Sequence, residues 1–515
     1  MKNTILILIF VSIFCLHGNC SRIFAVFMFP SVSHQVIFQP IWKELSLRGH
    51  QVTVVTPNPL KDQSLTNLTE IDISFTYKLP EIVGVLNSVG QKPTLVQKML
   101  SIFELNMLVF ESEMKSQAIQ EIIQRQNDKY DLVLLQYSHF ANVMLPFAYK
   151  FNAPAVGISS LGVFLHARDD IGNPTHPVIS PDYILGISGN MSFVERLKCF
   201  LYNLWYRALY YFYFLPRGDA IARTYFGDDM PYLGKLAKNL SLLLVSANPI
   251  IHTPTPNVPN IIEINQLHIK EKKPLPKDLQ EFLDGSPQGA IYFSLGSNMK
   301  SVNLSSTLRK EITTALAELP YNVIWKWEDD HLADKPDNVL IKKWLPQQDI
   351  LGHPNIKAFI TQGGLQSIEE AIINEVPLVG IPFFSDQPSN MRKIEEQGIG
   401  RMIDYASLTK EKLKSAVIEV SQNKKYKENI KRCKSILVDQ PTRGVDKAVW
   451  WIEYVLKHKG ARHLRSPAAD MSFFEYLMLD VISFLVMIII IASYGFYKLI
   501  MSVKKALSVR KIKKS

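Results

Sequence analysis

His34 is a side chain whose place in the sequence indicates acid–base chemistry. It lies in the segment FPSVSHQ, after the apolar run 23–29 and before a helical pattern over about 35–47. In an α/β fold this is the carboxyl end of a strand, where ligands bind. An imidazole with an ordinary pKa of about 6.5 can take a proton from a substrate hydroxyl. The alternative is that His34 only caps the helix or is buried.

Two glycine turns in the second half have the form of phosphate-binding loops. In AFITQGGLQSIEEAIIN, residues 358–374, an apolar run is followed by Gly363 and Gly364 and then by a helical pattern. Glycines let the backbone approach a ligand, and the amides and dipole of the next helix attract phosphate. The segment SLGS is a second such turn and adds the hydroxyl of Ser297. One such turn is equally compatible with no ligand, but two favour a nucleotide diphosphate.

Aromatic and acidic residues near these turns could bind the nucleoside. Trp344 in WLPQ offers a face for a planar base, beside the amide of Gln347. A tryptophan of the core is the alternative. Glu370 follows Gly363 by two helical turns, where a carboxylate could accept both ribose hydroxyls. An ordinary exposed helix residue is the alternative there.

A further polar pair could bind a sugar. Asp386 and Gln387 come directly after the predicted strand 377–381. Hydroxyl-rich sugars need such acceptors and amides. A plain helix N-cap is the competing interpretation of Asp386.

The elements that position these residues form two similar series. Short apolar runs alternate with helical patterns twice, which predicts two parallel α/β sheets. Proline-rich and polar stretches at 249–259 and 270–276 indicate a linker. We therefore expect an N-terminal Rossmann-like domain at 21–259, a linker at 260–285 and a C-terminal Rossmann-like domain at 286–465.

Both ends of the chain indicate a secretory membrane protein. Lys2 and an apolar run at 5–14 predict a signal peptide at 1–20, with a buried strand as the alternative. Residues 481–497 hold no charged side chain and would span about 25 Å as a helix. With the next few residues this predicts a transmembrane helix at 481–501. A buried core helix is the alternative.

The basic charge of the chain is concentrated in the predicted tail at 502–515. The formal net charge is +10, and seven of these charges lie in residues 498–515. The distribution favours a cytosolic tail and a lumenal ectodomain, and it does not support nucleic-acid binding. The last residues, KIKKS, have either the spacing of a dilysine retrieval signal or that of an ordinary basic flank.

The cysteines and the glycosylation sequons say less about the function than the motifs above. Beyond Cys15 and Cys20, only Cys199 and Cys433 remain, so one disulfide at most can form and no thiolate metal site. Four sequons fit a secretory route, namely Asn67, Asn190, Asn239 and Asn303. The aromatic segment 200–214 could lie on a membrane, form an acceptor wall or pack in the core.

From residue 344 to residue 387 the chain resembles the donor-binding signature of the UDP-glycosyltransferase family. The motifs WLPQQDILGHP, FITQGG, PLVGIPFFSDQ and DKAVWWIEYVLKHKGARHLR are highly specific for it. The resemblance covers nearly the whole chain and is greatest to membrane-bound animal members, especially those of insects. It implies a GT-B fold, with the acceptor in the N-terminal domain, the UDP-sugar in the C-terminal domain and a cleft between them.

The resemblance also implies roles for the donor site. Trp344 would stack on uracil, Gln347 would hydrogen-bond the base or ribose, and Glu370 would hold the ribose. Asp386 and Gln387 would bind the sugar hydroxyls. The diphosphate would lie against Ser297, Gln362, Gly364 and Ser367, with Gln362 standing where many members have histidine.

For catalysis, the resemblance implies that His34 is the general base of an inverting displacement in which UDP leaves. The acidic partner of this histidine is replaced here by Gln136, in YDLVLLQYS. A glutamine can fix the tautomer but cannot balance charge. Asp131 and His139 are alternatives. Because the chain has no Asp-x-Asp element, we expect no metal and no cofactor besides the UDP-sugar co-substrate.

The expected function is transfer of a hexose from a UDP-sugar to a small lipophilic acceptor at the endoplasmic reticulum membrane. The resemblance to insect members implies glucose as the transferred sugar, whereas vertebrate members use glucuronate, for whose carboxylate we place no Arg or Lys. The oligomeric state stays open, and a homo-oligomer is compatible with the sequence. A membrane-anchored binding protein without turnover is the alternative. A nicotinamide-dependent dehydrogenase is disfavoured because no G-x-G-x-x-G turn follows the first strand.

Overall fold

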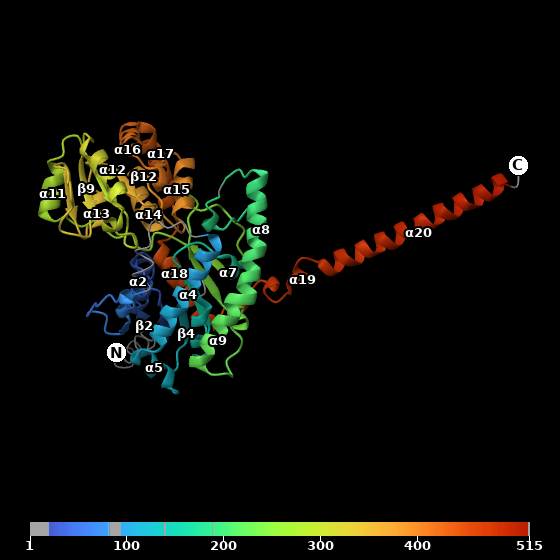
Figure 1. Ribbon diagram of the computed structural model, residues 1–515. Coiled ribbons are helices and arrows are strands. Elements are labelled where there is room, and N and C mark those ends of the chain that lie inside the picture. Colours follow the sequence, from blue (N-terminus) through green and yellow to red (C-terminus); the bar gives the residue numbers. More distant parts are fainter. Residues whose placement is uncertain (1–19, 81, 83–93, 139–140, 188, 513–515) are drawn as a thin grey trace, which may run out of the picture. The chain divides into compact units, whose positions relative to one another are not determined.

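The computed structural model describes residues 20–80, 82, 94–138, 141–187 and 189–512 (Figure 1). The predicted signal peptide, apart from residue 20, lies outside these residues, as do His139 and the last three residues of the tail. The chain divides into two compact units, Met1–Arg465 and Ser466–Ser515.

The first half of the larger unit contains a seven-stranded parallel sheet in the order β3-β2-β1-β4-β5-β6-β7. Its strands are β1 (Arg22–Val26), β2 (Gln51–Thr56), β3 (Leu68–Asp72), β4 (Leu132–Gln136), β5 (Ala155–Ser159), β6 (Leu242–Ser246) and β7 (Ile261–Ile264). The central strands are continuous apolar runs because helices cover both faces of a parallel sheet. All these strands end at one edge, which places the loops after β1, β4 and β5 side by side.

The described α-helices of this half differ widely in length, from 5 residues in α10 to 20 in α4. They are α2 (Val32–Leu47), α4 (Leu95–Met114), α5 (Gln117–Gln124), α6 (Pro146–Phe151), α7 (Leu165–Ile171), α8 (Phe193–Leu209), α9 (Leu215–Phe226) and α10 (Leu233–Ala237). Helix α2 is fixed by its apolar face, where Phe38 stacks on Phe27 at 4.5 Å between ring centroids. This packing sets the position of the first turn of α2, which carries His34.

The second half contains a six-stranded parallel sheet in the order β10-β9-β8-β11-β12-β13. Its strands are β8 (Ala290–Ser294), β9 (Asn322–Lys326), β10 (Val339–Lys342), β11 (Ile356–Thr361), β12 (Leu378–Gly380) and β13 (Gly400–Met402). Its helices are α11 (Lys277–Asp284), α12 (Ser306–Ala317), α13 (Gln347–Leu351), α14 (Leu365–Ile373), α15 (Gln387–Glu396), α16 (Lys410–Gln422) and α17 (Lys424–Val438). The prediction of two parallel α/β sheets is confirmed.

Helix α18 (Gly444–His458) follows the second half in sequence but packs on the first half. Its residues Ala448, Val449, Ile452 and Val455 share one core with β1 and α2. The predicted domain ranges differ from this arrangement, because they place α18 with the C-terminal domain and β7 in the linker. The apolar face of α18 packs against the first half. At this helix the chain therefore returns from the second half to the first.

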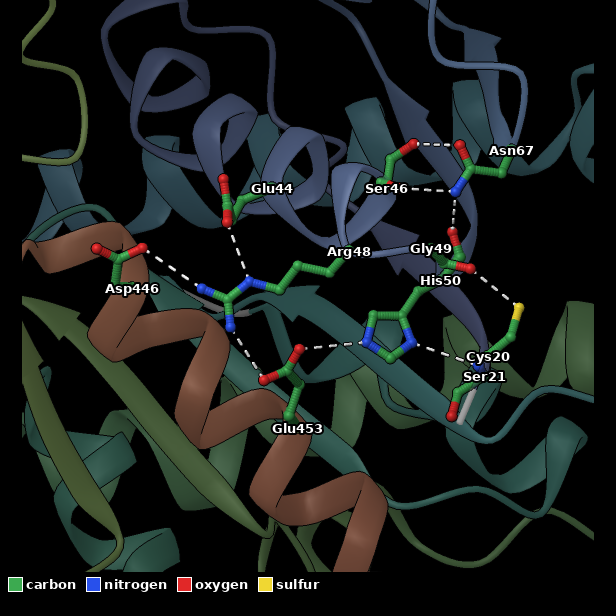
Figure 2. A network of polar contacts seen from close by, with 10 residues as sticks. All are labelled: Cys20, Ser21, Glu44, Ser46, Arg48, Gly49, His50, Asn67, Asp446 and Glu453. Atoms are coloured by element: carbon green, nitrogen blue, oxygen red, sulfur yellow. Dashed lines mark hydrogen bonds and ion pairs between the residues drawn. The ribbon is translucent and has the colours of Figure 1, made fainter. Parts of the chain in front are cut away.

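Ion pairs also join α18 to the first half, at the edge of the contact between α18 and α2. Arg48 lies 3.1 Å from Glu453 and 3.4 Å from Asp446 (Figure 2). About a third of each of these side chains is exposed, and such pairs contribute about 0–1 kcal/mol each. Burial of a large aliphatic side chain contributes about 1.5–3 kcal/mol. The apolar face of α18 therefore holds the helix, and the ion pairs fix its register.

Asn67, the first of the four sequons, is part of the same network in Figure 2. Its Nδ2 donates to the carbonyl oxygens of Ser46 and His50, both at 2.7 Å. A glycan on this nitrogen would remove one donor hydrogen, so the fold disfavours Asn67 as an acceptor. Asn190 and Asn239 are exposed. The buried cysteines Cys199 and Cys433 are both free.

The smaller unit consists of a short helix, α19 (Phe473–Tyr476), and a long one, α20 (Leu479–Ile512). The stretch Leu479–Leu507 of α20 is long and apolar enough to cross a membrane, and none of it is buried. The predicted span at 481–501 lies within this stretch. By length and composition, α20 is a candidate membrane anchor.

Candidate active site

His34 lies in the first turn of α2, beyond the carboxyl end of β1. Its Nδ1 is hydrogen-bonded to Oγ of Ser160, the residue that follows β5. Burial lowers the pKa of His34 to about 4, so the ring is neutral at physiological pH. A neutral imidazole held through one nitrogen can present the other to a substrate hydroxyl. His34 therefore has the neutral charge state that a general base needs.

Gln136, expected to orient His34, has a different contact in the structure. Its Oε1 accepts a hydrogen bond from the backbone N–H of Phe29 at 3.2 Å. It ends β4, which pairs with β1, so its side chain reaches the chain leaving β1 and holds that loop. Asp131 lies at the opposite end of β4, where Oδ2 accepts from the N–H of Arg22. In the structure, therefore, Ser160 and not Gln136 contacts His34.

Sequence reasoning missed Ser160. The available signal was its position two residues after the predicted strand 155–158, at the same sheet edge as His34. Choosing between Gln136 and Ser160 required the strand order and the direction of each side chain. The sequence does not contain that information.

The turn between β11 and α14 is built around two glycines. Gly363 has φ +87°, and a Cβ there would lie 2.6 Å from Cγ of Met391. Gly364 is the N-cap of α14 and provides no side-chain cap. The first amides of α14 therefore have no side-chain acceptor from the N-cap, which is the arrangement that suits a phosphate.

The turn after β8 faces Gln362. Gly296 has φ +81°, and the Nε2 group of Gln362 occupies the space that a Cβ at Gly296 would need. Gln362 Oε1 is buried and has no hydrogen-bond partner among the described residues. Ser297, next in the turn, is half-buried. Ser297, Gln362 and Gly364 thus come together around two glycine turns, as the sequence predicts for a diphosphate site.

Trp344 lies in the loop between β10 and α13 and is 69% exposed. The Nζ of Lys326 lies 5.9 Å from the centre of its ring. This exposure excludes the alternative of a core tryptophan. An indole ring this exposed can stack on a planar ligand.

Gln347 and Glu370 are joined in one partly buried network. Gln347 Nε2 donates to Glu370 Oε2 at 2.7 Å and to Ser367 Oγ at 2.9 Å. Gln348 Nε2 donates to the other oxygen of Glu370 at 3.0 Å. Burial raises the pKa of Glu370 to about 7. Glu370 is therefore not an ordinary exposed helix residue, and its network ties the WLPQ loop to α14.

Behind Glu370 lies a second buried carboxyl group, Glu369. Its Oε1 accepts from Asn248 Nδ2 at 2.6 Å, and its Oε2 is 3.8 Å from Nδ1 of His268. The Nε2 of His268 donates to the carbonyl of Gln366 at 3.1 Å, and burial lowers its pKa to about 4. Burial raises the pKa of Glu369 to about 7. This cluster joins the first half, through Asn248, to α14.

The substitution Glu369→Gln is expected to raise the free energy of unfolding, and this effect should grow as the pH rises. Because the pKa of Glu369 in the folded state lies above its ordinary value of 4.5, the cost of burying its charge appears above pH 4.5 and is complete above about pH 7. A neutral amide keeps the bond from Asn248 and removes the buried charge. We expect the free energy of unfolding of the variant to exceed that of the unsubstituted protein by about 1–3 kcal/mol at about pH 8. At about pH 4.5 the two should be nearly equal.

Thermal unfolding at the two pH values measures this difference. Glu281→Gln, at a mostly exposed position on α11, is the matched control and should change neither midpoint. An equal or lower stability of Glu369→Gln at about pH 8 would contradict the prediction.

Asp386 and Gln387 begin α15. The side chain of Asp386 makes no capping hydrogen bond, although the residue stands at the N-cap, and instead accepts from Asn390 Nδ2 at 2.6 Å. The plain N-cap interpretation is therefore wrong. Gln387 Oε1 accepts from the N–H groups of Phe383 and Phe384, so only its Nε2 group can serve a ligand.

A cavity of about 140 Å³ adjoins Asp386. The first half lines it with apolar residues of the loop after β5 and with Arg168 and His252. The second half contributes Asp386, Asn390 and Lys393. Lys393 is paired with Glu396 at 2.7 Å. Arg168 Nη2 donates to Thr255 at 3.1 Å, while its buried Nη1 has no hydrogen-bond partner among the described residues.

The two halves meet through the loops that carry the predicted chemistry. Asn298 Nδ2, next to Ser297 in the β8 turn, donates to Ser31 Oγ at 3.1 Å. Ser31 is the N-cap of the helix that carries His34. This contact therefore brings the start of the helix that carries His34 next to the glycine turn after β8. The arrangement defines the class of GT-B glycosyltransferases that use a nucleotide sugar.

Comparison with known proteins defines the family. The family model described as UDP-glucoronosyl and UDP-glucosyl transferase matches residues 25–514, and the chain belongs to this family. UDP-glucosyltransferase 2 of Dactylopius coccus is 35% identical over 94% of this chain and 93% of its own. UDP-glucuronosyltransferase 2C1 of Oryctolagus cuniculus is 34% identical over 88% and 92%.

A solved structure supports the same fold. The glycotransferase of kitacinnamycin superposes with a TM-score of 0.56 at 19% identity and covers 85% of this chain and 99% of its own. At this identity the likeness shows the fold alone. Together with the family match, it identifies the protein as a UDP-glycosyltransferase with a GT-B fold.

Proposed function

We propose that the protein transfers glucose from UDP-glucose to a hydroxyl of a small lipophilic acceptor, with inversion at the anomeric carbon. His34 takes the hydroxyl proton, the acceptor oxygen forms a bond to the anomeric carbon, and the bond from that carbon to the phosphate oxygen breaks. UDP leaves with the electron pair. The observation that carries this proposal is the contact between Asn298, in the glycine turn after β8, and Ser31, the N-cap of the helix that carries His34.

The donor would be bound by the groups already described in the second half. Trp344 stacks on uracil, and the Gln347–Glu370 network meets the ribose. The uncapped amides of α14 take the diphosphate charge as it develops, so the proposal includes no metal. Asp386 and the Nε2 group of Gln387 bind the hexose.

We propose glucose rather than glucuronate as the transferred sugar because of the charges around the cavity. Asp386 would repel a glucuronate carboxylate, and Lys393 is already paired with Glu396. Arg168 also lines the cavity, but its Nη2 donates to Thr255 and the nearby carboxylates of Glu263 and Asp169 offset its charge. The insect relative at 35% identity is named a UDP-glucosyltransferase, which agrees with this choice.

The cavity suits a lipophilic acceptor because the loop after β5 supplies apolar side chains to it. We further propose that α20 anchors the protein in the endoplasmic reticulum membrane, with the larger unit in the lumen. The apolar length of α20 and the basic residues that follow support this orientation. Protease treatment of sealed microsomes should leave the larger unit intact.

A donor panel tests the proposed function. Microsomes containing the protein, given a phenol, should release UDP from UDP-glucose faster than from UDP-glucuronate. Formation of the β-glucoside should match the UDP released. A faster reaction with UDP-glucuronate would overturn the choice of donor. Donor binding without any product would instead favour a binding protein without turnover.

Ser160→Ala is expected to lower kcat about ten-fold, because one hydrogen bond of roughly 1.4 kcal/mol no longer orients His34. The KM for UDP-glucose should stay the same, since Ser160 acts through His34 and not through the donor. Steady-state kinetics measure both constants. Ser246→Ala is the matched control, because Ser246 is also a buried serine at a strand end and its Oγ has no partner among the described residues. An unchanged kcat in Ser160→Ala would show that another group positions His34.

A further inference from the structure

A buried histidine lies within reach of two adjacent carboxyl groups of α14. His268 belongs to the segment between β7 and α11 and is 2% exposed. Its Nε2 lies 3.6 Å from Oε1 of Glu370, and its Nδ1 lies 3.8 Å from Oε2 of Glu369. Both carboxyl groups are buried as well. One imidazole ring therefore connects the two acidic side chains.

The hydrogen bonds of this cluster indicate which nitrogen of His268 carries a hydrogen. Its Nε2 donates to the carbonyl oxygen of Gln366 at 3.1 Å, so Nδ1 of the neutral ring has only a lone pair. Neither Nδ1 nor Oε2 of Glu369 has a hydrogen-bond partner among the described residues. A proton on either atom would be stabilised by the other, whereas a carboxylate facing a lone pair is unfavourable at a buried position. The geometry thus favours one proton shared by His268 and Glu369.

Burial acts on the three groups in directions that agree with this arrangement. It raises the pKa values of Glu369 and Glu370 to about 7 and lowers the pKa of His268 to about 4. Below about pH 7 the protons therefore lie on the carboxyl groups, and the ring is neutral. Because the three groups are close together, a ligand that requires a carboxylate changes the protonation of all three.

The cluster lies directly behind the group that is proposed to meet the ribose. Glu370 already accepts hydrogen bonds from Gln347 and Gln348, and an ionised carboxylate can accept more. Ribose hydroxyls that donate to Glu370 would favour its ionised form. A carboxylate formed there would attract positive charge onto His268, whose Nε2 is the near atom of the ring.

The other titratable groups around Glu370 act differently. Lys270, in the same segment as His268, carries a positive charge that favours the carboxylate. Burial raises the pKa of Tyr292 on β8 above its ordinary value of 10, so this phenol is neutral. Helix α17 packs on α14 through apolar side chains and the thiol of Cys433, whose pKa burial also raises. Between about pH 5 and pH 8, the proton changes are therefore those of the cluster itself.

We propose that His268 and Glu369 are positioning residues of the donor site, which share one proton and shift it onto His268 when the ribose of the UDP-sugar binds to Glu370. Glu370 releases its own proton to solvent, and the proton on Oε2 of Glu369 moves to Nδ1 of His268. The positive ring then lies beside the carboxylate of Glu370. This inference rests on the proposed function, in which Glu370 meets the ribose.

Two nucleotides that differ only in their ribose hydroxyls test the proposal, namely UDP and its 2′,3′-dideoxy analogue. Because both carry the same phosphates, the ratio of their Kd values cancels the titration of the phosphates. Calorimetric titration of the full chain in detergent gives both Kd values between about pH 5 and about pH 9. We expect the preference for UDP to rise with pH and to level off above about pH 7, as the carboxylate of Glu370 becomes available.

Glu369→Gln and His268→Gln should each move the midpoint of this rise upward by about one pH unit, so the preference for UDP at about pH 6 falls roughly ten-fold. The first variant removes the shared proton, and the second removes the ring that receives it. If Glu369 acted only as a neighbouring negative charge, its removal would ionise Glu370 more easily and move the midpoint down. A midpoint that moves down or stays in place would overturn the proposal.

Glu113→Gln and His50→Gln are the matched controls. Glu113 on α4 is another buried carboxyl group without a hydrogen-bond partner among the described residues. His50 is another buried histidine, beside the carboxylate of Glu453. Both variants should keep the midpoint of the unsubstituted protein. A shift as large as that of the Glu369 variant would overturn the proposal.

The same titrations separate this inference from the proposed function. Equal affinity of the unsubstituted protein for both nucleotides at every pH would show that Glu370 does not meet the ribose, and it would overturn the proposed donor contact together with this inference. A preference for UDP whose midpoint is the same in all variants would overturn this inference alone. UDP release from UDP-glucose and a phenol, measured on the same samples, tests the transferase activity independently.

Discussion

His34→Ala should lower kcat by about 10²- to 10⁴-fold, the range typical of a lost general base. UDP binding should be unchanged, because the groups proposed to hold the nucleotide lie in the second half of the larger unit. Burial places the pKa of His34 at about 4, so protonation should remove the base only as the pH falls through about 4. The rate assay with UDP-glucose and a phenol, combined with calorimetric titration of UDP, measures both effects.

His331→Ala is the control for this substitution, since His331 is exposed and its contact with Trp327 uses the backbone carbonyl. It should keep the full rate. A His34→Ala protein that also keeps its rate would exclude His34 as the base. The acid limb of the rate profile gives a second check, because a limb near the ordinary value of about 6.5 would mean that another histidine is titrating.

Trp344→Ala should weaken UDP binding by about 1–3 kcal/mol, roughly 5- to 150-fold in Kd, the range found for stacking of a base on an aromatic side chain. Because Trp344 is 69% exposed, its removal leaves no cavity in the core. The unfolding midpoint should therefore stay the same. Calorimetric titration of UDP measures the affinity, and thermal unfolding checks the fold.

Trp450 on α18 provides the matched comparison, because it is also an exposed tryptophan, at 53%. Trp450→Ala should leave the Kd for UDP unchanged. Equal Kd values for Trp344→Ala and the unsubstituted protein would mean that uracil binds elsewhere. That result would also remove the main support for placing the donor on the second half.

Much of the donor site could be predicted from the sequence because its parts are local. The two glycine turns and the helix after each strand lie within a few residues of one another, so their chemistry is visible in the chain order. The alternation of apolar runs with helical patterns predicted both sheets. The apolar stretch of α20 was equally visible, because span length and composition are properties of one segment.

Other features depend on residues that are far apart in the sequence. The contact between His34 and Ser160 joins positions separated by 126 residues, and its existence depends on the order β1-β4-β5 and on the direction of each side chain. Gln136 fits the sequence pattern equally well, yet its oxygen holds the backbone of Phe29. The crossing of α18 to the first half likewise depends on which surface matches its apolar face.

The sequence by itself determined the family, the two α/β sheets, the membrane-spanning candidate and the residue types of the donor site. Only the tertiary structure decided which side chain contacts His34, that Glu369 and Glu370 are both buried, and that Asn298 joins the second half to the start of α2. The reason is that periodicity and turn chemistry act between neighbours in the chain. Hydrogen bonds, burial and pKa values are instead set by neighbours in space.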